Sequence, residues 1–346
     1  MQRGEEMTRE TRGRRARLVF ALASLLLIAL ILMNLMMGSS QISPTDVLAT
    51  LTGASADPTL ATILFDIRLP RLIAAGLEGA ALALAGLLLQ TFFNNPIAGP
   101  FVLGISQGAK LAISILLVLV VGSTGILYSW LSILASIVGS ISVMLVTLAI
   151  SKRVHSNAML VVSGVMVGYV ANAASDLVVN FASDASVATL RMWGLGSFSG
   201  TSWSDVAWIS SIVGVCALAA LLLVKPLGAY LFGERYATEL GVDVVRFRRQ
   251  LIILSSVLAA TVTAFAGPIS FVGVAVPHLA RRALDTAKPA LTVPATLMLG
   301  ASFTLAADLV ARCAFAPTEI SVSTVTAVVG APVVLSVLMG RKGRDL

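Results

Sequence analysis

The sequence predicts an all-α, polytopic membrane protein with about ten transmembrane helices, since a bilayer core about 30 Å thick needs roughly 20 apolar residues per span. Hydrophobic residues make up 57% of the 346-residue chain and charged residues only 12%, whereas about a quarter of a soluble domain is charged. The mean hydropathy is +0.94. Long apolar runs recur along the whole chain, which favours a helical bundle over a barrel of strands about 10 residues long.

Each expected span is an apolar run flanked on both sides by polar residues, glycine or proline. The first run is too long for a cleaved signal and is expected to remain as a helix. Asn94, Asn95 and Pro96 break the chain after the second run, and Gly267 and Pro268 interrupt it before the eighth. The spans are expected at 18–37, 72–91, 101–121, 126–151, 158–181, 203–224, 250–266, 271–283, 291–310 and 322–339.

Three connections between these spans carry most of the polar residues. Residues 38–67 are expected to form a turn-rich loop, and residues 183–202 a polar loop with a short helix at 186–193. Residues 225–249 predict a helix over 227–240 that Gly241 caps, then a turn at 244–249. This last segment is folded and partly apolar, so it could bind a protein or lie on lipid, and the residues alone favour neither.

The charges predict the orientation of one membrane domain over residues 18–340. With residues 1–17 inside, 19 of the 24 Lys and Arg fall on the inner side, including those of the 225–249 loop and the 341–346 tail. Because Lys and Arg accumulate in cytoplasmic loops, both termini are predicted to be cytoplasmic. The same placement explains the net charge of +7 without any binding of nucleic acid.

Four arginines fall on the outer side, against the positive-inside rule: Arg68, Arg71, Arg191 and Arg312. Arginine is suited to bidentate recognition of carboxylates. We therefore expect a docking surface for an acidic partner at the Arg68–Arg71 pair. Asp308 and Arg312 are four residues apart, so a local ion pair on one helix is the alternative for Arg312.

Glu78 and Lys110 are expected to form an ion pair within the membrane. At 1.5 Å per residue, Glu78 lies about 9 Å from the outer surface and Lys110 about 14 Å from the inner one. In a core about 30 Å thick, the two side chains come near the same level. A structural pair between adjacent helices is favoured over contact with a substrate.

Several function classes lack their signatures. The chain has no G-x-x-x-x-G-K-[ST] phosphate loop, so any ATP hydrolysis is expected in another subunit and not in this one. Cys216, Cys313, His155 and His278 do not have metal-ligand spacing, and no metal or cofactor is expected in this chain. Dense intramembrane carboxylates or histidines of a proton relay are also missing, which weighs against an ion-coupled secondary transporter.

The chain carries a series of short motifs in order: Arg68-Leu69-Pro70-Arg71, Asn95-Pro96-Ile97-Ala98-Gly99-Pro100, Trp193-Gly194-Leu195-Gly196-Ser197, Gly267-Pro268-Ile269-Ser270-Phe271-Val272-Gly273, Pro277-His278-Leu279-Ala280-Arg281 and Asp308-Leu309-Val310-Ala311-Arg312. These motifs and their spacing, over about residues 60–340, resemble the FecCD family. Its members are permease subunits of type II ATP-binding-cassette importers for iron–siderophores, haem and cobalamin. Gln107 and Lys110 stand where small or apolar residues are usual.

The resemblance implies partners and roles for individual residues. The partners are a second copy or a related permease, a cytoplasmic ATPase dimer that holds ATP and Mg, and an extracytoplasmic substrate-binding protein. The binding protein is expected to dock on Arg68, Arg71 and Arg312. Coupling to the ATPase is expected through Leu227, Gly228, Ala237, Leu240, Gly241 and Val242. The translocation path is expected along 166–181, 186–193 and 322–334, with Asn172, Ser175, Asn180, Arg191, Trp193, Ser323 and Thr326 as lining side chains.

The expected function is therefore that of a multi-pass permease subunit in the cytoplasmic (inner) membrane, surrounded by lipid. An iron chelate is the expected cargo, with siderophore–iron first and haem second. A cobalamin importer is the alternative. Two other classes remain: an ion-coupled secondary transporter, and a receptor or scaffold that binds the outer protein and translocates nothing. No residue in the sequence separates one chelate from another.

Overall fold

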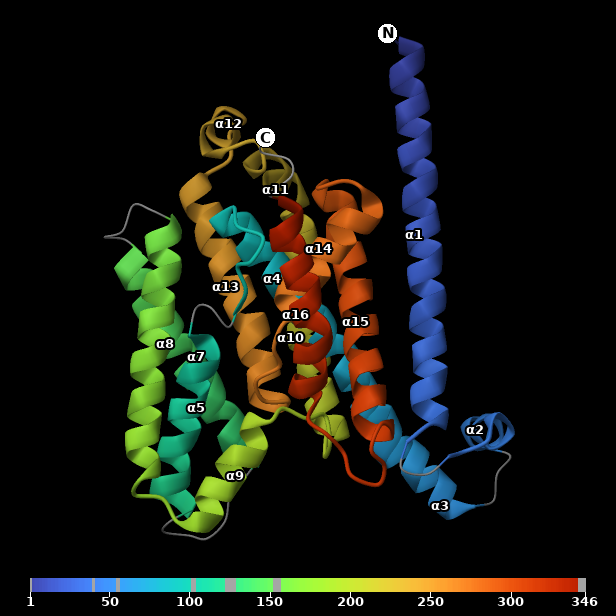
Figure 1. Ribbon diagram of the computed structural model, residues 1–346, viewed down its shortest axis with the longest axis vertical. Helices are drawn as coiled ribbons and strands as arrows, with labels where there is room; N and C mark the ends of the chain where they lie inside the picture. Colours follow the sequence, from blue (N-terminus) through green and yellow to red (C-terminus); the bar gives the residue numbers. More distant parts are fainter. Residues whose placement is uncertain are drawn as a thin grey trace.

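The computed structural model describes residues 2–38, 41–53, 57–100, 104–121, 129–151 and 157–341, in which every regular element is helical (Figure 1). The helices are α1 Gln2–Met36, α2 Pro44–Leu51, α3 Pro58–Ala61, α4 Leu69–Phe93, α5 Ile105–Leu116, α7 Ser129–Ser151, α8 Asn157–Val179, α9 Asp184–Gly194, α10 Trp203–Leu222, α11 Val224–Tyr230, α12 Glu234–Glu239, α13 Val244–Phe265, α14 Val272–Leu284, α15 Pro289–Cys313 and α16 Val322–Arg341, with π-helical segments η1 Thr62–Arg68 and η3 Leu117–Val121.

The all-α fold class is confirmed for the described residues. Six of the helices are long and apolar enough to cross a membrane, and α5 and α16 contribute shorter apolar stretches. The count of ten spans and the side on which the termini lie stay predictions. The starts expected at residues 101 and 126, and residues 342–346 of the tail expected at 341–346, fall outside the described residues.

The loop expected at 38–67 is wrong, because much of this segment is helical. Ser43 caps α2 by accepting a hydrogen bond from the Asp46 backbone, and Asp57 caps α3 in the same way at Thr59. Proline follows each cap, at the first helical position, where its missing N–H costs nothing. From α3 the chain continues as helix through η1 into α4.

The inner segment also differs in detail from the expected helix at 227–240. Gly233, with φ of 109°, separates α11 from α12. Gly241 has φ of 82°, the left-handed conformation expected of a residue that ends a helix. The turn expected at 244–249 is the first part of α13, where Asp243 accepts from the Arg246 backbone at 3.0 Å.

Helix α4 lies at the centre of the bundle and is buried along most of its length, packed by α10, α13, α14 and α15. Glycines on facing helices let two backbones meet: a Cβ on Gly300 of α15 would lie 2.5 Å from the Gly79 carbonyl oxygen. At the other end, a Cβ on Gly273 of α14 would lie 2.9 Å from the Leu82 carbonyl oxygen. Small residues therefore set the spacing of the central helices.

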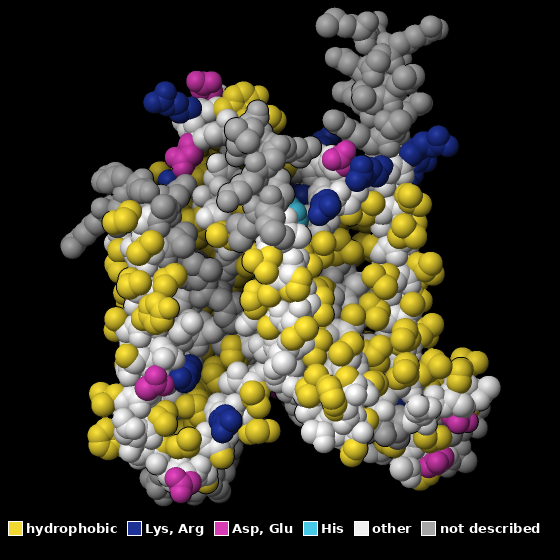
Figure 2. All heavy atoms as spheres, viewed as in Figure 1, with side chains coloured by type: hydrophobic (Ala, Val, Ile, Leu, Met, Phe, Trp, Pro, Cys, Tyr) yellow, Lys and Arg dark blue, Asp and Glu magenta, His cyan; other side chains and the backbone are white. Residues whose placement is uncertain are grey.

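A second group of helices, α5, α7 and α8, packs together and joins the centre through α13, which contacts both α4 and α5 (Figure 1). Following the predicted orientation, we call the end with α12 the inner end and the end with α9 the outer end. Lys and Arg gather mostly at the inner end on the face shown in Figure 2. There Arg15 of α1 pairs with Asp285 at 3.3 Å, which places the N-terminal half of α1 beside the α14–α15 turn.

Replacement of Gly86 by alanine is expected to disrupt the bundle, because a Cβ at this position overlaps the Gly273 backbone. Overpacking of this kind should lower the free energy of unfolding by about 3 kcal/mol. Thermal unfolding of the purified protein in detergent measures the effect. Gly76→Ala is the matched control, since its Cβ finds its nearest neighbour at 3.9 Å. Equal melting temperatures for the two variants would contradict the close approach.

Candidate functional site

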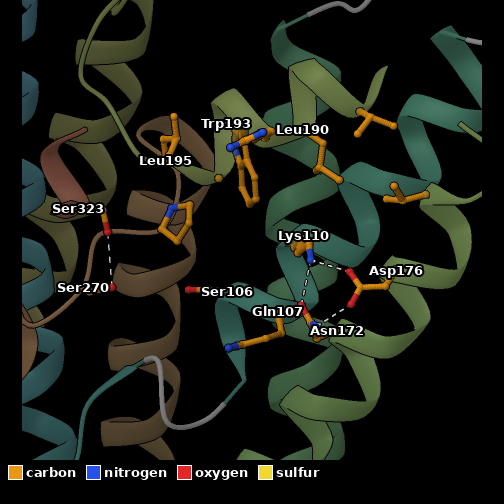
Figure 3. Close-up of a pocket in the computed structure, with 15 residues that line it drawn as sticks. Ser106, Gln107, Lys110, Asn172, Asp176, Leu190, Trp193, Leu195, Ser270 and Ser323 are labelled. Atoms are coloured by element: carbon orange, nitrogen blue, oxygen red, sulfur yellow. Dashed lines mark hydrogen bonds and ion pairs between the residues drawn. The ribbon is translucent and has the colours of Figure 1, made fainter. Parts of the chain in front are cut away.

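An outer pocket of about 580 Å³ lies between α5, α8, α9, the segment before α14 and the start of α16 (Figure 3). Four of the side chains expected to line a path lie in its wall: Asn172, Arg191, Trp193 and Ser323. Pockets for small molecules usually measure about 300–1,000 Å³ and combine apolar walls with a few polar groups. The lining here has that character, because Val179, Val187 and Leu190 stand beside the polar side chains.

Local backbone bonds bring the pocket's elements together. Ser183 caps α9 at its outer end by accepting from the Ser186 backbone. After α9, Ser197 donates from its backbone to the Ala266 carbonyl at 2.9 Å, and Val322 donates to the Gly196 carbonyl at 3.2 Å. The end of α9 therefore joins the end of α13 and the start of α16, so that Trp193 and Ser323 border one cavity.

Lys110 forms a closed polar network with α8. Its Nζ donates to Asn172 Oδ1 and to Asp176 Oδ1, both at 2.9 Å, and Asn172 Nδ2 donates to Asp176 Oδ2 at 2.9 Å (Figure 3). The side chain of Lys110 is 32% exposed and that of Asp176 59% exposed. The pair thus faces the pocket and is not sealed inside the bundle.

The expected Glu78–Lys110 ion pair is wrong. Glu78 is 1% exposed on α4, and its Oε2 has no hydrogen-bond partner among the described residues. Lys110 pairs with Asp176 instead. The depth estimate treated consecutive spans as neighbours, but α5 packs mainly on α7 and α8, and α13 contacts both α4 and α5.

The other expected path residues lie elsewhere. Ser175 is fully buried and shares a 2.6 Å hydrogen bond with Ser114, while Thr326 is buried and donates to the Ser323 carbonyl. Asn180 is exposed in the turn after α8 and does not line the pocket. Ser106, Gln107 and Ser270 line the pocket but were not predicted to do so, and Asp176 lies in the expected path segment 166–181 but was not named as a lining side chain. The spacing of Asn172 and Asp176, one helical turn apart, was a signal that could have found Asp176.

The outer arginines Arg68, Arg71 and Arg312 come together, but inside the protein. Their exposed fractions are only 5%, 6% and 6%. Arg71 Nη2 lies 3.0 Å from Asp308 Oδ1 and 3.0 Å from Glu319 Oε2, and Arg312 Nε lies 3.1 Å from Asp308 Oδ2. The local Asp308–Arg312 pair, the alternative to docking, is confirmed.

The same arginines hold the backbone of the outer loops. Arg68 donates to the Leu35 carbonyl at the end of α1, and Arg312 donates to the Asn34 side chain and to the Met37 carbonyl. Arg71 donates two hydrogen bonds, from Nη1 and Nη2, to the carboxylate of Glu319 in the turn between α15 and α16. Direct contact of these guanidinium groups with a partner is not supported by their burial. Their role in docking stays a prediction, and in this structure they could act on a partner only through the outer loops that they hold.

The inner segment divides the expected coupling residues into two groups. Leu227 and Ala237 are 2% and 0% exposed, so they pack within the protein and do not form its surface. Leu240 and Gly241 are exposed, and Gly228 and Val242 are partly buried. Leu240 belongs to a group of exposed apolar side chains on α11, α12 and their turns, here called the inner apolar patch: Leu231, Phe232, Tyr236 and Leu240.

A polar chain holds the inner apolar patch against α13. Tyr230 donates to Glu234 Oε1 at 2.9 Å, and Arg248 pairs with the same oxygen at 2.9 Å. Burial, together with the hydrogen bond to Glu234, raises the pKa of Tyr230, so the phenol stays a neutral donor. Arg248 also lies over the ring of Phe92, 4.9 Å from its centre. The patch is therefore a fixed surface and not a loose loop.

Comparison with known proteins agrees with this architecture. The FecCD transport family matches residues 26–340. The vitamin B12 import system permease protein BtuC of Klebsiella pneumoniae is 33% identical over 331 residues, 96% of each chain. The hemin transport system permease protein HmuU of Yersinia pestis is 30% identical and covers 94% of this chain and 96% of its own. A metal-chelate type ABC transporter in an inward-facing conformation superposes with a TM-score of 0.82 at 27% identity, over 94% of this chain and 99% of that one.

Replacement of Asp308 by asparagine should destabilise the protein by about 3 kcal/mol, because removal of one partner leaves buried charges unpaired. Arg71 and Arg312 both lose their shared carboxylate. Asp184→Asn, an exposed carboxylate in the first turn of α9, serves as the control and should change stability by less than about 1 kcal/mol. Chemical denaturation in mixed micelles gives both values, and similar midpoints for the two variants would argue against a structural cluster.

Proposed function

The chain belongs to the FecCD transport family and is the permease subunit of an ATP-binding-cassette importer, a multi-pass protein of the cytoplasmic (inner) membrane; we propose that it translocates an iron chelate. Siderophore–iron is the first choice and haem the second. The outer pocket is the single observation that carries this proposal. It is large enough for a small chelate, and its wall joins apolar side chains to a few polar and charged ones.

The relatives support a chelate as cargo without choosing one. The relatives include permeases for vitamin B12 and for hemin, and the structural neighbour is a metal-chelate type ABC transporter. A cobalamin importer is therefore the alternative. An ion-coupled secondary transporter is the less favoured class, because Asp308 and Asp176 in the described spans are paired with cations. Glu78, buried on α4 without such a pair, is the exception.

We propose that this subunit performs no covalent chemistry and that ATP and Mg bind in a separate cytoplasmic ATPase dimer. The inner apolar patch supports such a contact, since exposed apolar groups held rigidly mark binding surfaces. A second permease copy, or a related permease, is proposed to cover the pocket side of the bundle. A substrate-binding protein is proposed to dock at the outer end, on loops that Arg68, Arg71 and Arg312 anchor from within.

ATP-dependent uptake tests the proposed function. The permease, its ATPase and its binding protein are reconstituted in liposomes, and the ligand that copurifies with the binding protein is identified by absorbance and mass. We expect uptake of that ligand only with a hydrolysis-competent ATPase, and stimulation of the ATPase by loaded binding protein. Uptake with a hydrolysis-dead ATPase would indicate a secondary transporter. Stimulation or binding with no uptake would indicate a receptor.

An aspartate at Phe232 or Leu240 should reduce copurification of the ATPase by about tenfold or more, because a charge placed in an apolar contact must lose its water. Both side chains are well exposed, so the folded permease should tolerate the change. Leu48→Asp, an equally exposed apolar position on α2 at the opposite end, is the control. If the Phe232 and Leu240 variants bind the ATPase as well as the unchanged protein does, the inner apolar patch is not part of the interface.

A further inference from the structure

The charges in the outer pocket do not balance. Lys110 and Arg191 are its cations and Asp176 is its carboxylate. Among the described residues the side chain of Arg191 forms no hydrogen bond or ion pair, although it borders the cavity. An ammonium group has three donors, and Lys110 directs two of them to Asn172 and Asp176. The pocket therefore holds an excess of positive charge and unused donors.

Uncharged groups in the wall add further unmet bonding capacity. Trp193 Nε1 is a donor shielded from solvent without a hydrogen-bond partner in the described residues, and Gln107 Oε1 is an acceptor in the same condition. Shielded polar groups are normally paired, and exceptions need a reason. Both side chains line the pocket. Neither atom is accessible from the cavity, so the accessible charged side chains, and not these two groups, are placed to contact a ligand.

The exposure of the Lys110–Asp176 pair also differs from that of the structural pairs. In the outer cluster Asp308 is 0% exposed and both of its arginine partners are below 10%. By contrast, the Asp176 side chain is 59% exposed and opens onto the cavity. Charged side chains within spans usually face an aqueous path and take part in what passes along it. A ligand in the pocket can therefore reach this ion pair and take the place of one of its partners.

We propose that the outer pocket binds metal chelates through free anionic oxygens, chiefly carboxylates, with Lys110 and Arg191 as the binding cations. Asp176 and Asn172 hold the Lys110 ammonium when no cargo is present, and the carboxylate of a chelate takes the place of Asp176. This inference rests on the proposed function and narrows its cargo. A neutral chelate would gain nothing from Arg191, and a cationic one would be repelled.

Four variants separate cargo binding from a structural ion pair. Lys110→Met and Arg191→Gln should each lower the uptake of a carboxylate-bearing chelate by about tenfold, the effect of losing a charge-assisted hydrogen bond. Asp176→Asn frees the ammonium, so uptake should stay the same or saturate at lower concentration. The double variant Lys110→Met with Asp176→Asn should stay as deficient as Lys110→Met. Lys288→Met, an exposed lysine at the inner end, controls for loss of a lysine and should transport normally.

A purely structural pair gives a different pattern. Both single changes at Lys110 and Asp176 would then impair uptake to a similar degree, and the double variant would recover because no charge is left unpaired. That recovery would overturn the inference. The melting temperature of each complex, measured in parallel, identifies variants that fail through misfolding, and Arg191→Gln, at an exposed side chain without a partner, supplies a variant that should fold in any case.

The choice of transported compound distinguishes a failure of carboxylate binding from a failure of the proposed importer function. Uptake is measured with haem and ferric citrate, which carry free carboxylates, and with a neutral ferric trihydroxamate and cyanocobalamin. We expect the complete complex to favour haem or ferric citrate. ATP-driven uptake of only the neutral probes would overturn the binding role of Lys110 and Arg191 and leave the importer standing. If the complete complex transports no probe and no ligand of its binding protein when ATP is hydrolysed, the proposed function itself fails.

Discussion

Close contact between the backbone of α4 and the helices around it is the constraint on which the rest of the structure depends. Lipid is as apolar as a leucine side chain, so helices in a membrane associate through fitted packing and not through exclusion of water. Gly79 and Gly300 bring α4 and α15 together, and Gly86 and Gly273 do the same for α4 and α14. Those contacts fix the outer end of α15, which carries Asp308, and the segment before α14, which borders the pocket.

The outer arginines follow from this placement. An arginine on the outer side of a membrane protein violates a statistical rule, and partner docking is one reason for it. The structure gives another: the carboxylate of Asp308 lies fully buried where α15 meets α4, and Arg71 and Arg312 neutralise it from two helices. A buried charge is strongly destabilising without its partner. The same arginines also donate hydrogen bonds to Glu319 and to the backbone at the end of α1. The position of the outer loops is therefore set by groups anchored in the core.

Much of the chain's layout was available from the sequence, because polar breaks and charges determine where a helix begins and ends and how deep a residue lies. The break at Asn94 and the interruption at Gly267 were predicted, and so was the short helix before Trp193. Which helices touch was not available. Glu78 and Lys110 have matching depths, but α5 faces α7 and α8, so depth without neighbours gave the wrong partner. The same limit hid the burial of Arg71 and of Ala237, since one helix face cannot be assigned inward before its neighbours are known.

The Asp308 cluster and the Asp176 cluster differ in whether one chain completes them. Asp308 is paired with Arg71 and Arg312 of the same chain. Asp176 lies near the end of a candidate span, Val162–Val179, with most of its side chain uncovered. A carboxylate cannot face lipid without a large cost, so this side of α8 must meet protein or water. The neighbouring side chains Tyr169, Val170 and Leu177 are exposed and apolar, which suits contact with a second chain better than contact with water. A pocket with charged groups at its centre and apolar groups around it is therefore what one half of an aqueous path between two permease subunits should look like.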